Sequence, residues 1–331
     1  MTPLPENAAA QTSNLLPART SSQTLLRVLL RIGGSILVLV LIFRILPLGQ
    51  VWAALRLLPA ELWIMVLAGY LIAHIVGVAK WRMMVNLAGA GLTFAQAARC
   101  YFAGLFSTLF LPSIVGGDLV RAGLALRLGR SKAAVLLGSL IDRMLDVTAL
   151  VSLTALGALL APSALDPVSR RLFMMVAVAV ASAGVIVIAT LALLPSRYFS
   201  FRIRRKLVRV RKAWRSILRQ PQYVFATLAL GVLIQGSFVL FTVRVADACA
   251  LHLPLRAWLF AWPLAKLSAL LPVTQGGIGV REAALAALLV PFGARAVLTV
   301  AVGLAWEAII ISGGLLAGLA SFLLGKFAAK N

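Results

Sequence analysis

Long apolar segments constrain this chain more than any other feature of its sequence. A helix of about 20 residues crosses the hydrocarbon core of a bilayer, where only helices and closed barrels satisfy their backbone hydrogen bonds. The apolar segments are residues 32–43, 62–79, 133–160, 172–195, 222–243 and 296–325. They lack the alternation of apolar and polar residues that barrel strands require. The sequence therefore predicts an all-α integral membrane protein with about five full transmembrane helices.

Composition and charge placement support this prediction. Charged residues make up 12% of the chain, whereas a soluble domain carries about 25%. The net charge of +23 is compatible in principle with nucleic-acid binding, but the basic residues lie between the apolar segments, as they do in cytoplasmic loops of membrane proteins. We therefore expect membrane lipids as partners and no nucleic acid.

The densest basic stretch runs from Arg197 to Arg219 and holds ten Lys or Arg and no acid. Apolar residues recur in it at helical spacing, which predicts a basic amphipathic helix lying on an anionic cytoplasmic leaflet. The alternative interpretation is that this stretch only sets the membrane topology, with no ligand role.

The expected domain organisation is simple. Residues 1–24 are polar and proline-rich and predict a disordered cytoplasmic tail, and residues 25–331 form a single membrane domain. This domain is expected to contain a first repeat at about 60–160 and a second at about 221–325. The segment 62–79 ends at Lys80 and Arg82, which we interpret as its cytoplasmic boundary. Both termini are expected in the cytoplasm.

A duplicated motif marks the two repeats. Residues 111–121 align without a gap with residues 271–281, and the two share Leu, Pro, Gly-Gly, Val and Arg. Each motif separates two apolar segments, 93–111 from 116–128 and 257–271 from 279–292, which are too short or too charged to cross the bilayer. We predict two re-entrant helical hairpins, the first entering from the cytoplasm and the second from outside. Such an inverted-topology repeat points to a transporter site near the bilayer midplane.

The tips of these hairpins offer an anion site. Proline ends the first half-helix, and paired glycines allow a tight turn before a second half-helix begins with unpaired N–H groups. Arg121 and Arg281 lie one turn further on, and a guanidinium matches a phosphate in a bidentate way. We predict a phosphate headgroup between the two tips, with Asp118 capping its half-helix. The alternative is that each arginine pairs internally, with Asp118 or Glu282.

Other charged residues inside apolar segments are candidates for the same site. They are Asp142 and Arg143, which share part of a helix face with Asp146, Lys266 deep in a short half-helix, and Glu307 in the last long segment. Intramembrane charges are functional candidates by default, and the alternative is internal Arg–carboxylate pairing. Two separate cysteines and two isolated histidines predict no metal site and no cofactor.

The motifs, taken together, resemble the lysylphosphatidylglycerol synthase transmembrane (flippase-type) family. The resemblance covers about residues 25–325 and rests on Leu-Pro-x3-Gly-Gly-Asp-x2-Arg, a following Asp-Arg, and a later Leu-Pro-x3-Gly-Gly-Ile-Gly-Val-Arg-Glu. It implies a protein of the bacterial inner membrane that moves lipids or lipid-linked headgroups between leaflets. The substrate-binding residues that it implies are Pro112, Gly116, Gly117, Asp118, Arg121, Asp142, Arg143, Pro272, Gly276, Gly277, Gly279 and Glu282.

The sequence departs from this family in two ways. No aminoacyl-transferase domain follows Asn331, so a stand-alone member is expected and lysine transfer is not assigned. Glu307 stands where the analogy with Arg143 suggests a basic or neutral residue, so lysylphosphatidylglycerol itself is not implied as the substrate.

Three classes of function remain open at this stage. The preferred one is a lipid flippase that is not an enzyme, because no catalytic constellation is found. The second is a membrane enzyme acting on a polyprenyl phosphate, although the tips lack clustered Glu, Ser and His. The third is a non-transporting membrane partner of a lipid synthase. A homo-oligomer is also open.

Overall fold

The computed structural model describes residues 48–111, 113–162, 167–193, 201–270 and 277–328. Over these ranges the regular secondary structure is entirely helical. The predicted tail at 1–24 and the apolar segment at 32–43 lie outside the described residues, as do Pro112, Pro272 and Gly276.

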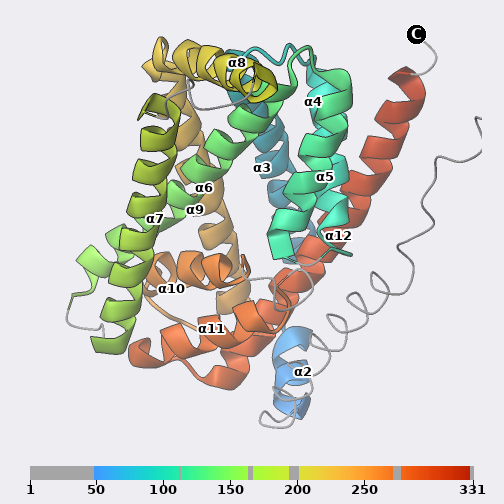
Figure 1. Ribbon diagram of the computed structural model, residues 1–331. Helices are drawn as coiled ribbons and strands as arrows, with labels where there is room; N and C mark the ends of the chain where they lie inside the picture. Colours follow the sequence, from blue (N-terminus) through green and yellow to red (C-terminus); the bar gives the residue numbers. More distant parts are fainter. Residues whose placement is uncertain (1–47, 112, 163–166, 194–200, 271–276, 329–331) are drawn as a thin grey trace, which may run out of the picture.

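The helices follow one another with short connections (Figure 1). They are α2 (Leu48–Arg56), α3 (Ala60–Leu87), α4 (Phe94–Ser107), α5 (Ser113–Leu128), α6 (Lys132–Leu160), α7 (Pro167–Leu193), α8 (Phe201–Leu218), α9 (Pro221–Ala248), α10 (Leu255–Ser268), α11 (Val280–Leu289), the 3-10 helix η2 (Val290–Phe292) and α12 (Ala296–Ala328).

Four helices of the described chain are long and apolar enough to cross a membrane, namely α3, α7, α9 and α12. Helix α6 has 29 residues, but charged residues at positions 142, 143 and 146 interrupt its apolar sequence. The chain is therefore a multi-pass helical membrane protein.

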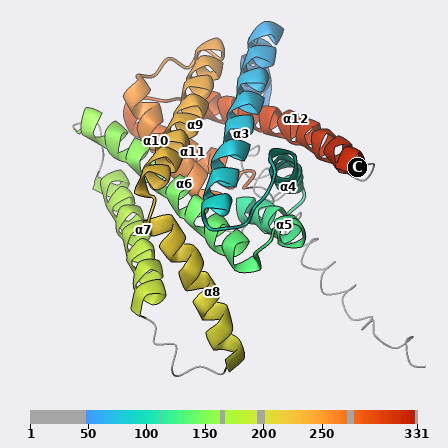
Figure 2. The same cartoon turned by 90° about the horizontal axis from the view of Figure 1, so that it is seen from above.

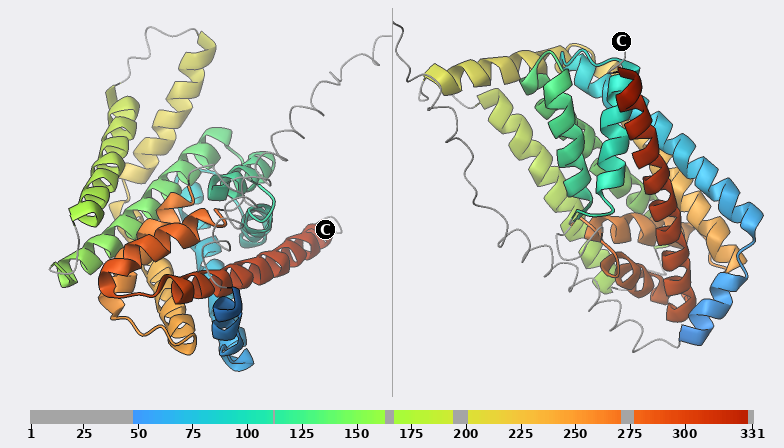
Figure 3. Two further views of the ribbon diagram at one scale, coloured as in Figure 1. Left: turned by 90° about the horizontal axis from the view of Figure 1, so that it is seen from below. Right: turned by 90° about the vertical axis from the view of Figure 1, so that its right-hand side faces the viewer.

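The long helices form a bundle with α8 lying across one end (Figure 1). Seen from above, α7 and α8 lie at the edge of the bundle beside α6 (Figure 2). Helices α4 and α5 pack against each other. The connections from α3 to α4 and from α5 to α6 both lie at the end of the bundle that α8 covers. Helices α10 and α11 pack against each other near the opposite end, and run crosswise to α9 (Figures 1 and 3).

Local sequence explains where two of these helices begin. The Thr93 hydroxyl accepts a hydrogen bond from the Gln96 backbone N–H at 3.2 Å, and the Gln96 side chain accepts one from the Thr93 N–H at 3.0 Å. This capping box starts α4. The Ser131 hydroxyl accepts from the Ala134 N–H at 3.3 Å and starts α6 in the same way.

Two clusters of buried apolar side chains hold the bundle together. One gathers around α10 and α12 and includes Trp258, Phe260 and Ile309. The other joins the end of α3 to α4, α6 and α8, and includes Trp81 and Ile217. Along α3, Ala73 belongs to the first cluster and Val78 to the second. The polar side chain of His74 lies between them.

The second half-helix of the first motif begins earlier than the sequence predicts. Helix α5 starts at Ser113, so Gly116 and Gly117 lie inside the helix rather than before it. The prediction that Asp118 caps this helix is therefore wrong. Paired glycines do not end a helix by themselves, and here they let two backbones approach, because a Cβ on Gly117 would overlap the carbonyl oxygen of Gly104 in α4.

The second motif behaves differently. Gly277 and Gly279 both adopt φ of +85°, a conformation that glycine allows at little cost, and α11 begins at Val280. The Glu282 carboxylate accepts a hydrogen bond from the Gly279 N–H at 2.6 Å and so caps this helix. The two motifs share their sequence but not their local backbone.

Candidate functional site

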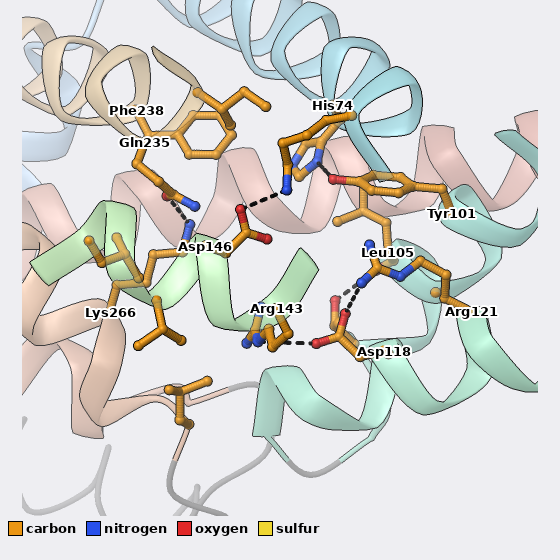
Figure 4. A pocket seen from close by; sticks show the side chains of 18 residues that line it. His74, Tyr101, Leu105, Asp118, Arg121, Arg143, Asp146, Gln235, Phe238 and Lys266 are labelled. Carbon is orange, nitrogen blue, oxygen red and sulfur yellow. Dashed lines mark hydrogen bonds and ion pairs between the residues drawn. The ribbon is translucent and has the colours of Figure 1, made fainter. Parts of the chain in front are cut away.

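A cavity of about 120 Å³ lies where α3, α4, α5, α6, α9 and α10 meet, and we call it the charged cavity. All six of these helices contribute polar residues to its lining (Figure 4). These polar residues are His74, Lys80, Tyr101, Thr108, Asp118, Arg121, Arg143, Asp146, Gln235 and Lys266.

Lys80 connects two carboxylates of α6. Its ammonium group lies 2.5 Å from the Asp142 carboxylate and 2.9 Å from that of Asp146. Only 3% of the lysine side chain is exposed. The prediction that Lys80 marks the end of a membrane span is therefore wrong. The apolar face of α3 continues past it through Trp81 and Met84, and the helix ends only at Leu87.

Arg121 lies against both acids and aromatic rings. Its guanidinium is 3.0 Å from the Asp118 carboxylate and 3.6 Å from Asp142. The same group lies 5.0 Å from the Trp81 ring centroid and 5.2 Å from that of Tyr101, distances at which cation–π attraction contributes. This first arginine is internally paired.

Arg143 shares the Asp118 carboxylate with Arg121, at a nitrogen–oxygen distance of 3.3 Å. Its side chain is 27% exposed, the most open of the cations paired with a carboxylate at this cavity. Asp118 therefore pairs with Arg121 within α5 and links α5 to α6 through Arg143 (Figure 4).

Lys266 differs from the other cations around the charged cavity. Its ammonium donates a hydrogen bond to the Gln235 side-chain oxygen at 2.8 Å and lies 4.9 Å from the Phe238 ring centroid and 5.0 Å from that of Trp262. Among the described residues, no carboxylate comes within 4.0 Å of it. Figure 4 shows this side chain reaching the cavity from α10, opposite Arg143 and Asp146. Neutral partners leave its charge available to an anion.

A second cavity of about 370 Å³ adjoins the first, and we call it the apolar cavity. Five residues line both cavities, namely His74, Leu105, Thr108, Phe238 and Lys266. Most other walls are aliphatic or aromatic side chains of α12 and of the turn that follows α4. At its edge Phe110, Ile311 and Leu315 are 56%, 41% and 53% exposed. The cavity therefore opens towards the lipid-facing surface between α4 and α12.

The second predicted arginine lies at the apolar cavity and is fully paired. The Arg281 guanidinium lies 2.7 Å from the Glu282 carboxylate and 2.6 Å from that of Glu307. Glu307 comes from α12, so this triad fixes the start of α11 to the last long helix. Two acids against one base leave no excess positive charge here.

The predicted site residues thus fall into three groups. Asp118, Arg121, Arg143, Lys266 and Gly117 line the charged cavity, and Asp142 pairs with two residues of that lining. Arg281 and Glu307 line the apolar cavity. Gly277, Gly279 and Glu282 shape the turn before α11, Gly116 contacts Leu111, and Pro112, Pro272 and Gly276 lie outside the described residues.

Six polar lining residues of the charged cavity were not predicted as site residues, namely His74, Lys80, Tyr101, Thr108, Asp146 and Gln235. His74, whose ring nitrogen lies 3.2 Å from the Tyr101 hydroxyl, appears isolated in the sequence. Lys80 follows an apolar segment, and extending that helix by two turns would have identified it as an intramembrane charge. Gln235 is a polar residue within the apolar run 222–243, which is a similar signal.

Asp146 was recognised as a membrane carboxylate but not included in the predicted site. No group of three or more His, Cys, Asp or Glu side chains in the described chain is arranged to hold a metal ion.

Comparison with known proteins identifies one family. A family model described as the lysylphosphatidylglycerol synthase TM region matches residues 28–318, nearly the whole chain. No curated protein and no solved structure gives a significant match.

Proposed function

The chain belongs to the family of lysylphosphatidylglycerol synthase TM regions, and from this premise we propose that it moves a lipid with an anionic headgroup between the leaflets of a bacterial inner membrane. The observation that carries the proposal is Lys266, a cation without a carboxylate partner among the described residues, at the junction of a charged and an apolar cavity.

The two adjoining cavities match the two halves of a phospholipid. The charged cavity would hold the phosphate, and the apolar cavity, open between α4 and α12, would hold the start of an acyl chain. A phosphate in the charged cavity reaches Lys266 and the partly exposed Arg143. A charge-assisted hydrogen bond from such cations compensates the desolvation of the phosphate.

The roles proposed for the two motif arginines differ from a simple phosphate clamp. Arg121 and Arg281 hold carboxylates of their own or neighbouring helices, so we assign them to positioning. Gly117 and Asp118, near the start of α5, line the phosphate side of the cavity.

The helix packing supports an inverted repeat of α3–α6 and α9–α12. Helix α4 packs on α5 and on α12, while α10 packs on α11 and on α6. The proposed counterparts are α4 and α10, α5 and α11, and α6 and α12. When each helix is replaced by its counterpart, the contacts of α4 become those of α10. In this proposal the α4–α5 and α10–α11 pairs are re-entrant hairpins that enter from opposite membrane surfaces, which is the arrangement of many transporters.

The basic helix α8 supports the proposed orientation. It lies at the end of the bundle where α4 begins, α5 ends and α12 ends (Figure 1). Because basic segments are retained in the cytoplasm, this end of the bundle, with the end of α12, is assigned to the cytoplasmic side.

Leaflet exchange in reconstituted vesicles tests the proposal. We expect purified protein to accelerate the exchange of fluorescent phosphatidylglycerol, and Lys266→Gln to reduce the rate about tenfold or more, since a hydrogen bond to a charged group contributes about 1.5–3 kcal/mol. Lys266→Arg should retain most of the rate. Lys132→Gln, which removes an exposed lysine at the start of α6, is the matched control.

Three other results of these experiments would contradict the proposal. Full activity in Lys266→Gln removes Lys266 from the site. No exchange by any folded form contradicts transport and favours a partner of a lipid synthase, and release of phosphate from a polyprenyl pyrophosphate favours the membrane enzyme.

A further inference from the structure

A third cavity, of about 420 Å³, lies among α6, α7, α8 and α9, and we call it the α7–α8 cavity. It shares no lining residue with the charged or apolar cavity. Helix α6 separates them, since Asp146 and Leu150 face the charged cavity whereas Leu145 and Thr148 face this one. Its volume is in the range of ligand sites, about 300–1,000 Å³.

The interior of the α7–α8 cavity accepts only hydrocarbon. Its walls are almost entirely aliphatic apart from Trp214, and the hydroxyls of Thr148 and Ser152 already donate to carbonyls of their own helix at 2.9 Å each. Gly184 of α7 lines the cavity, and a Cβ added there would meet no atom within 4 Å. The space therefore suits an acyl chain rather than a polar ligand.

One wall is the amphipathic helix α8, which contributes Trp214, Ile217 and Leu218. Arg211 precedes Trp214 by three residues, and Arg215 precedes Leu218 by three, so both lie along the rim of this wall by helical geometry. Arg215 is exposed and Arg211 is half-buried. Two cations thus border an apolar cavity at the bundle end that α8 covers (Figures 1 and 2).

We propose that the α7–α8 cavity binds one anionic phospholipid from the leaflet on which α8 lies. The acyl chain occupies the space between α6 and α7, and the phosphate meets Arg211 and Arg215. Guanidinium groups match phosphate oxygens in geometry and charge. This lipid is held in place and is distinct from the transported one, so the inference does not depend on the proposed function.

Helix α7 supplies the structural reason for such a lipid. None of the 18-residue apolar stretch that qualifies α7 as a membrane span is buried by protein, and its described contacts are with α6 and α8. A lipid chain between α6 and α7, anchored on α8, would hold these three helices together.

Photolabelling tests the site directly. The full-length protein is reconstituted in phosphatidylcholine vesicles that contain a small fraction of phosphatidylglycerol carrying a diazirine on one acyl chain, and labelled peptides are identified by mass spectrometry. We expect labelling at cavity-facing positions of α6 and α7, and a clear preference over the same probe built on phosphatidylcholine. Arg215→Gln should reduce this preference about fivefold, the equivalent of about 1 kcal/mol for one basic residue at an anionic surface.

Two pairs of variants separate the cavity from the general lipid-facing surface. Gly184→Leu fills the cavity and should remove most of the labelling, whereas Gly236→Leu places the same side chain in open space on α9, outside this cavity, and should not. Arg209→Gln, on the opposite side of α8 from the cavity wall, controls for the loss of charge. Equal labelling by both probes, or unchanged labelling in Gly184→Leu with normal thermal stability, would overturn the proposal.

Discussion

Lys80 and Asp142 form the most enclosed ion pair of the site, and Asp146 is the second carboxylate of the same lysine. The two side chains in the closest pair, Lys80 and Asp142, are 3% and 1% exposed. Burying charges costs several kcal/mol per ion, and mutual attraction offsets this only while both partners are present. The lysine therefore compensates the charges of two carboxylates on α6, and in this way links α3 to α6.

At the residue scale, Lys80→Met should destabilise the protein strongly. The change keeps the apolar stem but removes the closest cation of two carboxylates, leaving Asp142 only the more distant Arg121 at 3.6 Å, a loss of about 3–5 kcal/mol for a broken buried pair. Thermal unfolding in detergent measures the effect.

A second substitution should restore part of that stability. Lys80→Met combined with Asp142→Asn removes one of the stranded charges, so its unfolding temperature should lie between those of Lys80→Met and the unaltered protein. Lys132→Met, at an exposed position, serves as control. A Lys80→Met protein as stable as the control would mean that water reaches this group.

Individual residues show which features of the site can be predicted from the sequence. Lys266, Arg121, Arg143 and Asp118 could be predicted because a charge in an apolar segment has few explanations. The pairing of Arg121 with Asp118, three residues apart on one helix, was the stated alternative. The pairs between helices, such as Arg143 with Asp118, could not be predicted, since they depend on which faces of separate helices meet. The same ambiguity hid His74, whose neighbour Tyr101 comes from another helix.

At the scale of helices, glycines determine how closely two backbones approach. Gly104 of α4 faces Gly117 of α5, and a Cβ on Gly104 would lie 2.7 Å from the Gly117 carbonyl oxygen and 2.9 Å from the Arg121 Cβ. The contact positions Arg121 at the charged cavity. Close approach through small residues is a common way to pack membrane helices.

Two alanine substitutions in α5 should therefore have opposite effects. Gly117→Ala forces α4 and α5 apart, and overpacking of this kind costs about 1–3 kcal/mol. Gly123→Ala adds a methyl group where no atom lies within 4 Å, and should be neutral or stabilise the helix by up to about 1 kcal/mol. Unfolding temperatures compare the two, and equal shifts would exclude a tight α4–α5 contact.

The helix elements show the limit of motif-based prediction. The short segments around each motif were predicted, because length and charge exclude a full crossing. The start of α5 at Ser113 was not, since the same Gly-Gly pair is helical in α5, whereas Gly277 adopts positive φ before α11. Only tertiary contacts distinguish these two uses of one sequence.

At the scale of the whole molecule, the α4–α12 and α10–α6 contacts join the two proposed repeats. Transport by rocking one repeat against the other would change these contacts. The apolar segments and the duplicated motif predicted the membrane class and two related halves, but the reciprocal packing of α4 and α10 required the structure.

Restraining one of these contacts should stop transport without unfolding the protein. Gly318 of α12 packs against Phe106 of α4. Phe106→Cys with Gly318→Cys, in a chain whose native cysteines at 100 and 249 are alanine, should lose leaflet exchange on treatment with a short, reducible bifunctional thiol reagent, and regain it on reduction. Each single-cysteine variant should stay active under the same treatment. Full exchange in the cross-linked protein would argue against rocking at this contact.

The charged residues of the interior have a further, electrical consequence. The charged cavity, the apolar cavity and their direct ion-pair partners include five cations and five carboxylates. The cations are Lys80, Arg121, Arg143, Lys266 and Arg281, and the carboxylates are Asp118, Asp142, Asp146, Glu282 and Glu307. Their formal charges cancel, so a lipid that is transported without another ion would carry only its own charge across the membrane. One elementary charge moving through 100 mV changes the free energy by about 2.3 kcal/mol. With the cytoplasm negative, the membrane voltage would drive an anionic lipid outward and leave a zwitterionic lipid unaffected.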